Sequence, residues 1–159
     1  MAVNLKKRPR TGYPRYSYIP TTEEYEKWLD KRDETYTGSC QHFLSSLALD
    51  CVEENRFHLY EPISWGSTYL ITKPLPSDSI HTILIDSTYY IRRAYYHGYL
   101  LVNYEDIFDI YESSLEFKDE YVDVDSFGYN LTPYSLKKNG YWASLRIADT
   151  LPRNYRPPK

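Results

Sequence analysis

The apolar residues of the N-terminal third follow helical spacing. Thr21 and Glu24 have the spacing of a capping box, and the apolar positions after them predict an amphipathic helix that ends near Arg32. A polar turn over residues 33–38 separates it from a second helix, for which Ser39 is the predicted N-cap. The second helix has the wider apolar stripe and is predicted to be the core helix. Its stripe consists of Cys40, Phe43, Leu44, Leu47 and Cys51, widened by Ala48 and Val52.

Beyond the second helix the pattern changes to short β-rich runs separated by Pro, Gly, Ser and Asp, which is typical of antiparallel strands and turns. Strands are predicted near residues 68–72, 80–86, 88–92, 98–103, 121–124 and 141–147, and a short helix over 106–113. The fold class expected from this order is α+β, with N-terminal helices packed on an antiparallel β-sheet.

Both ends of the chain differ in composition from the part between them. Residues 1–20 are basic and interrupted by three prolines, which predicts an extended arm, and the tail over 149–159 has a similar composition. We therefore expect an arm over 1–20, a single domain over 21–148 and an extended C-terminal tail over 149–159. A length of 159 residues is consistent with one domain.

Charge is placed unevenly along the chain. The formal net charge of -3 disfavours general nucleic-acid binding, yet residues 1–15 carry five basic residues and no acid. Residues 105–125 carry nine acids against one lysine, which predicts either a solvated face or a surface for a protein partner. The candidate partner-binding residues are Asp119, Glu120, Asp123 and Asp125 in the acidic block, and Arg8, Arg10, Tyr13 and Tyr16 in the arm.

The two cysteines, Cys40 and Cys51, lie eleven residues apart in the predicted core helix, which separates them by about 16 Å and excludes a disulfide between them. Reduced thiols and the absence of a long apolar run favour a cytoplasmic protein, or one in the host cytoplasm if it is viral, with no membrane segment. The sequence contains no zinc-ligand spacing and no Gly-rich phosphate loop, so neither a metal nor a cofactor is expected.

The segment Gly38-Ser39-Cys40-Gln41-His42-Phe43 carries the candidate chemistry. It places a thiol at a predicted helix N-terminus, where unpaired N–H groups and the helix dipole stabilise a thiolate. A nucleophilic thiol needs a base and a group that orients the base. His81 lies at the start of one predicted apolar strand, and Asn103 lies at the end of a later strand with an equally clear apolar pattern. Cys40, His81 and Asn103 converge if the sides of the two strands that carry His81 and Asn103 face the helix.

The segment Gly38-Ser39-Cys40-x-x-Phe43 resembles the nucleophile segment of papain-like cysteine peptidases, including their compact bacteriocin-processing and transglutaminase-like relatives. The order of a cysteine at the start of a central helix, a histidine at the start of a strand and an asparagine after a later strand also matches. The resemblance implies Cys40 as nucleophile, His81 as general base and Asn103 as its orienting group. The stretch before Cys40 lacks the glutamine that donates to the oxyanion in that family, so the chain is expected to be a small cysteine hydrolase or an inactive relative.

A non-enzymatic interpretation accounts for other features. The chain has 19 tyrosines, and tyrosine is enriched where proteins bind one another. Basic, proline-containing arms suit a subunit of a larger assembly, and the acidic block resembles the surface of a viral inhibitor that imitates a phosphate backbone. Cys40 is then a small buried apolar residue, and His81 and Asn103 are ordinary strand and turn residues. This alternative predicts a protein-binding or assembly protein of unknown oligomeric state.

Overall fold

The computed structural model describes residues 21–65, 70–107, 109–144, 151 and 155. In this part of the chain, α1 (Thr22–Tyr36) and α2 (Cys40–Leu49) precede all of the strands. The strands are β1 (Phe57–Trp65), β2 (Leu70–Leu75), β3 (His81–Asp86), β4 (Ile91–Tyr95), β5 (Gly98–Glu105), β6 (Ile110–Phe117), β7 (Tyr121–Val124) and β8 (Leu136–Gly140), and the short helix α3 (Tyr141–Ser144) follows them. The predicted α+β class is confirmed.

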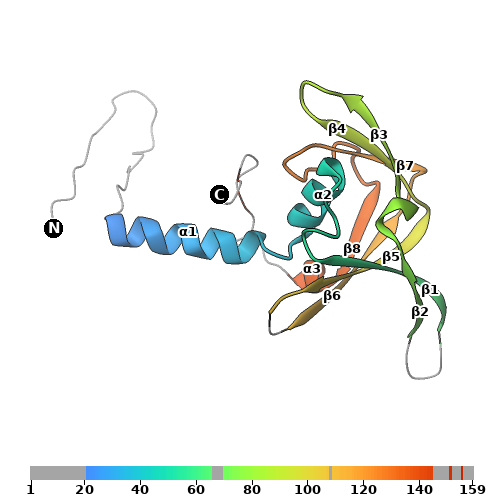
Figure 1. Ribbon diagram of the computed structural model, residues 1–159, viewed down its shortest axis with the longest axis horizontal. Coiled ribbons are helices and arrows are strands. Elements are labelled where there is room, and N and C mark those ends of the chain that lie inside the picture. The colour runs from blue at the N-terminus through green and yellow to red at the C-terminus, as the bar shows by residue number, and fades with distance from the viewer. Residues whose placement is uncertain (1–20, 66–69, 108, 145–150, 152–154, 156–159) are drawn as a thin grey trace, which may run out of the picture.

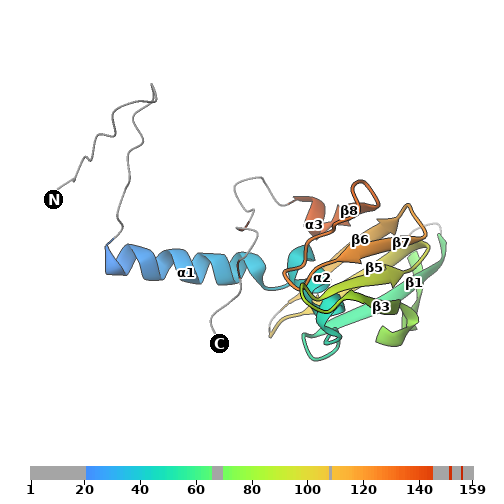
Figure 2. The same ribbon diagram turned by 90° about the horizontal axis from the view of Figure 1, so that it is seen from above.

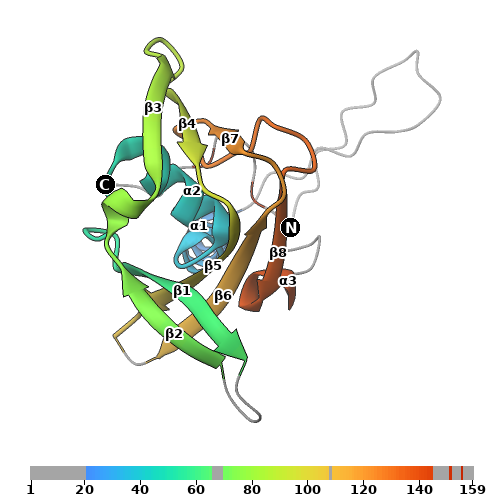
Figure 3. The same ribbon diagram turned by 90° about the vertical axis from the view of Figure 1, so that its right-hand side faces the viewer.

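The strands form two antiparallel sheets that lie on different sides of α2. The large sheet has the order β2-β1-β5-β6-β8 and the small sheet the order β3-β4-β7. Figure 1 shows α2 beside both sheets and α1 extending away from them. In Figure 3, viewed from the side opposite α1, α2 lies between the two sheets.

The core forms where the inner faces of both sheets meet α2. Alternate residues of β5 and β6 are buried, as expected for strands with one face on the core. The apolar stripe of α2 fills the space between the sheets. Its members Phe43, Leu44 and Leu47 are buried with Phe57 and Leu59 from β1, Leu100 and Val102 from β5, Leu115 and Phe117 from β6, and Ala94, Val122 and Val124 from the small sheet.

Several predicted elements differ from the observed ones. Residues 106–113 were expected to form a helix, but 110–117 form strand β6, which pairs with β5 over its whole length. Residues 141–144 form helix α3 rather than the start of a strand, and neither β1 nor β8 was predicted. The core helix ends at Leu49 because Asp50 adopts the left-handed conformation at its C-cap, so Cys51 lies outside it.

The connection between α1 and α2 passes through Gly38, where several elements meet. Its N–H donates to Nδ1 of His42 at 3.2 Å, and its carbonyl accepts from Nε1 of Trp142 at 2.7 Å. The φ of Gly38 is +70°, and a Cβ at this position would lie 2.6 Å from the Tyr104 ring. A glycine is therefore required both by the backbone conformation and by the close approach of β5.

His42 lies next to Gly38 inside an aromatic cluster. Its ring centroid is 4.8 Å from that of Tyr36 and 4.9 Å from that of Phe57. Burial lowers the pKa of His42 to about 4, so the ring is neutral at physiological pH and its Nδ1 accepts the Gly38 hydrogen bond. His42 is thus a structural residue of the junction between the helices.

Over the residues that the structure describes, no helix is both long enough and apolar enough to cross a membrane. The predicted arm over 1–20 lies outside the described residues, as does most of the predicted tail. Within the tail, Tyr155 is described and is buried: its hydroxyl donates to Asp33 and its ring lies 5.9 Å from that of Tyr36. This contact connects the C-terminal part of the chain to α1.

Candidate functional site

Cys40 is the first residue of α2, as expected, but its side chain faces the core. It is only 3% exposed and belongs to the cluster of buried apolar residues. Burial raises the pKa of Cys40 to about 11, although the neighbouring Lys138 acts in the opposite direction. Burial therefore outweighs the effect of Lys138, and the thiol is protonated at neutral pH.

His81 lies near the opposite end of α2. It is exposed on β3, where it pairs with Tyr95 and the two ring centroids are 5.9 Å apart. It lines a cavity of about 270 Å³ together with Leu47 and Asp50. Leu47 and Asp50 follow Cys40 by seven and ten positions, which corresponds to about 10–15 Å along the axis of α2.

Asn103 lies on the outer face of the large sheet. It pairs with His58 of β1 and with Glu112 of β6. Its neighbours Val102 and Tyr104 are buried on the inner face, so the alternation of a strand directs Asn103 away from α2. The structure therefore does not bring Cys40, His81 and Asn103 together, because the two strands present the opposite sides from those that convergence requires.

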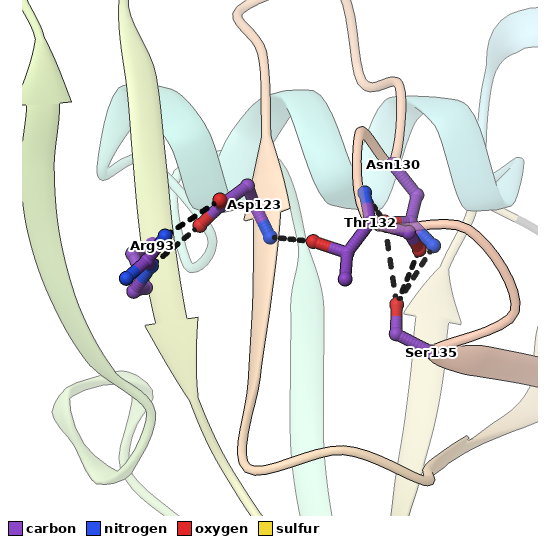
Figure 4. A network of polar contacts seen from close by, with 5 residues as sticks. All are labelled: Arg93, Asp123, Asn130, Thr132 and Ser135. Carbon is purple, nitrogen blue, oxygen red and sulfur yellow. Dashed lines mark hydrogen bonds and ion pairs between the residues drawn. The ribbon is translucent and has the colours of Figure 1, made fainter.

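The four candidate acids of the 105–125 block do not form one surface. Asp123 accepts two hydrogen bonds from the Arg93 guanidinium, at 2.8 and 2.9 Å, and its N–H donates to Thr132 (Figure 4). The Arg93 guanidinium also lies 3.8 Å from the centroid of the Tyr121 ring. Both charges of this pair are therefore already engaged within the small sheet.

Asp125 is 8% exposed and stabilises the loop after β7. Its Oδ1 accepts from the N–H groups of Phe127 and Tyr129, both at 3.0 Å. Only Asp119 and Glu120, between β6 and β7, are exposed as expected for partner-binding acids. The other four candidates, Arg8, Arg10, Tyr13 and Tyr16, lie outside the described residues.

A different acidic surface lies between the C-terminal half of α1, the β5–β6 hairpin and α3. Here a groove of about 810 Å³ is lined by four carboxylates and one ammonium group, that of Lys31. We call it the acidic groove. Its carboxylates are those of Asp30, Asp33 and Glu34 on α1 and Asp106 after β5. Lys31 forms an ion pair with Glu34 at 2.8 Å, and Asp33 accepts from Tyr155.

Three tyrosine rings form the other wall of the acidic groove. Tyr104 and Tyr111 are directly opposite each other on β5 and β6, with ring centroids 6.5 Å apart, and Tyr141 of α3 lies 4.8 Å from Tyr111. Burial, followed by the charges of nearby acids, raises the pKa of Tyr104 and of Tyr111. Their hydroxyls therefore stay protonated at neutral pH. Tyr111 and Tyr141 present neutral aromatic surface beside the carboxylates, whereas Tyr104 is largely buried.

The sequence contained only part of the signal for this groove. The enrichment in tyrosine indicated a binding surface, and Asp106 belonged to the acidic block. The position of Tyr111 was missed because residues 106–113 were interpreted as a helix, which does not place Tyr111 opposite Tyr104. The contribution of α1 depends on its tertiary position and has no local sequence signal.

Among the residues that the structure describes, no group of three or more His, Cys, Asp or Glu side chains is arranged to hold a metal ion. Comparisons of the chain with protein-family models, with curated proteins and with solved structures found no match. The function is therefore inferred from the geometry of the chain itself.

Proposed function

We propose that this protein is a non-enzymatic protein-binding protein, and that it holds a positively charged segment of its partner in the acidic groove. The observation that carries this proposal is the position of three tyrosine rings beside four carboxylates along one groove. Carboxylates attract arginine and lysine through charge-assisted hydrogen bonds, and tyrosine faces attract the same cations. A groove with both features suits an arginine- or lysine-containing segment better than an acidic or purely apolar one.

The geometry around Cys40 gives no comparable support to the hydrolase interpretation. A nucleophile needs a base within hydrogen-bond reach and access to substrate. Cys40 is buried, its pKa is raised, and His81 is exposed near the other end of α2. The non-enzymatic interpretation of the chain therefore accounts for more of the described residues.

The proposal is tested by titrating the full-length protein into a fluorescein-labelled octa-arginine peptide and measuring fluorescence anisotropy. The groove variant is Asp30→Asn with Asp106→Asn, which removes two charges and keeps the side-chain shape. Loss of one charged contact of about 1.4 kcal/mol weakens binding about tenfold, so we expect at least that decrease. Raising the ionic strength should weaken wild-type binding as well, because exposed charges are screened.

The matched control is Asp119→Asn with Glu120→Gln, which removes the same charge from exposed acids between β6 and β7. This variant should bind the peptide within twofold of the wild type. An equal loss of affinity in the two variants would show that only the overall charge matters, and a wild type that does not bind the peptide would also refute the proposal.

A further inference from the structure

We infer that the acidic groove of one copy receives the basic arm, residues 1–20, of a second copy of this chain. This inference rests on the proposed function and names the partner of the same groove. The occupant must be rich in cations and able to lie extended along a groove. The arm meets both requirements from its sequence, since it carries five basic residues, no acid and three prolines.

The composition of the arm matches both walls of the groove. Its basic residues are Lys6, Lys7, Arg8, Arg10 and Arg15, and three tyrosines lie among its last eight residues. Arginine side chains pair with carboxylates and stack on tyrosine rings, and tyrosine side chains pack on other aromatic rings. Asp30 and Asp106 provide two of the four carboxylates of the groove, and Tyr111 and Tyr141 provide two of its three rings.

The position of α1 favours a second copy over the arm of the same chain. Figures 1 and 2 show α1 extending from the body, with its N-terminal end far from the sheets. The arm joins α1 at that far end, whereas the groove lies at the C-terminal half of the helix, over Asp30–Thr37. α1 has 15 residues and is about 22 Å long, so an arm that occupied its own groove would have to reverse direction and run back along α1, whereas a second copy can receive an extended arm without that reversal.

The reach of the arm is sufficient for a contact between copies. The basic positions 6–10 precede the first residue of α1 by at least 12 residues, and an extended chain covers about 40 Å over that length. An arm of one copy in the groove of another produces either a reciprocal dimer or a head-to-tail assembly, according to the angle between the copies. Both outcomes require association that depends on concentration.

The first experiment measures the mass of the full-length protein by sedimentation velocity over a range of concentrations. Two charge-reversed variants are compared with it: the arm variant Arg8→Glu with Arg10→Glu, and the groove variant Asp30→Lys with Asp106→Lys. Each should weaken self-association at least about tenfold, the effect of one lost charged contact. The control, Asp119→Lys with Glu120→Lys, should associate like the wild type.

Complementation then tests whether the arm and the groove contact each other. In a mixture of the two variants, the intact arm of the groove variant meets the intact groove of the arm variant, and the reversed arm meets the reversed groove. Association should therefore return in the mixture but not in either variant alone. Variants that remain monomeric after mixing, or a wild type that is monomeric at every concentration, would overturn the inference.

A synthetic peptide of residues 1–20, titrated into the full-length arm variant, separates failure of this inference from failure of the proposed function. We expect binding in this titration. If octa-arginine binds and the arm peptide does not, the inference fails and the proposed function stands. If the arm peptide binds but the wild type stays monomeric, each groove holds the arm of its own chain, which refutes a second copy. If neither peptide binds, both proposals fail.

Discussion

Substitution of Gly38 by alanine tests the junction that positions both helices. Gly38 has a φ of +70°, in the left-handed region, where an L-residue with a Cβ is strained. The added Cβ would also lie 2.6 Å from Cδ1 and 3.0 Å from Cγ of Tyr104. These are ring atoms near the backbone of β5, and the ring lies against His42 and Phe57, so it has little freedom to move away.

The expected cost follows from these two effects. The backbone conformation costs about 1–2 kcal/mol for an L-residue in the left-handed region. Overpacking against a fixed ring adds about 1–3 kcal/mol. Gly38→Ala should therefore lower the free energy of unfolding by about 2–5 kcal/mol, a large share of the 5–15 kcal/mol that is typical of a domain.

Urea denaturation monitored by tryptophan fluorescence measures this cost, and Gly98→Ala is the matched control. Gly98 also has a positive φ, +89°, but a Cβ there would have no neighbour within 4 Å. Gly98→Ala should lower the free energy of unfolding only by the cost of the backbone conformation, about 1–2 kcal/mol. In a Tyr104→Ala background, the additional cost of Gly38→Ala should approach that of Gly98→Ala. Equal costs for the two glycines in the wild-type background would refute the clash with Tyr104.

Three further predictions concern other residues. Burial lowers the pKa of His42 from 6.5 to about 4, so the neutral ring's contribution to the free energy of unfolding is fully present above pH 6.5 and is lost as the pH falls toward 4, by roughly 3 kcal/mol in total. Urea titrations of His42→Asn should show a correspondingly smaller loss over this pH range, and an unchanged loss would exclude His42 as its source. Iodoacetamide should label native Cys40 more slowly than Cys51, because Cys40 is buried and Cys51 is partly exposed; faster labelling of Cys40 below pH 7 would restore the catalytic hypothesis. The edge strand β3 exposes apolar residues, with Ile83 46% and Ile85 50% exposed, so heated molecules should aggregate by pairing at this edge. Ile83→Lys should therefore reduce light scattering on heating more than Ile110→Lys does, and equal effects would argue against pairing at this edge.

The elements that were predicted correctly have strong local signals. The capping box at Thr21 is present, since Glu24 accepts from the Thr21 N–H at 2.9 Å and donates its own N–H to the Thr21 hydroxyl at 3.3 Å. Ser39 likewise accepts from the N–H of His42 at the start of α2. Such contacts lie within three residues of each other, so the sequence alone contains most of the information that determines them.

The β6 region shows why other elements were not predicted. Burial alternates along β6, and Ser113, Leu115 and Phe117 lie on the buried face. Serine is polar, however, so the hydrophobic pattern does not assign Ser113 to the core. The Ser113 hydroxyl accepts from the N–H of Trp142, which explains why a small polar residue is buried there. The contact joins residues 29 positions apart, so no local window contains it.

Cys40 shows the same limit for chemistry. A helix N-terminus favours a thiolate, and that local rule is correct as far as it goes. The orientation of the helix decides the outcome, because α2 turns Cys40 toward the core and burial there raises the pKa of the thiol. Which face of a helix is buried follows from the apolar stripe, and Cys40 belongs to the same stripe as Phe43 and Leu47. The apolar stripe was therefore stronger evidence about the burial of this thiol than its position at the helix N-terminus was.

The acidic groove depends in turn on the register of one hairpin. Tyr104 lies opposite Tyr111, which puts both rings on the inner face of the large sheet, toward α1 and α3. A slip of one residue would place Ile110 or Glu112 opposite Tyr104 and would turn the Tyr111 ring to the outer face, because side chains alternate along a strand. The wall of three tyrosines would then be lost while every local sequence signal stayed the same. The binding surface is thus a property of the pairing between β5 and β6, and a variant that shifts this register should lose octa-arginine binding even when all four carboxylates of the groove are retained.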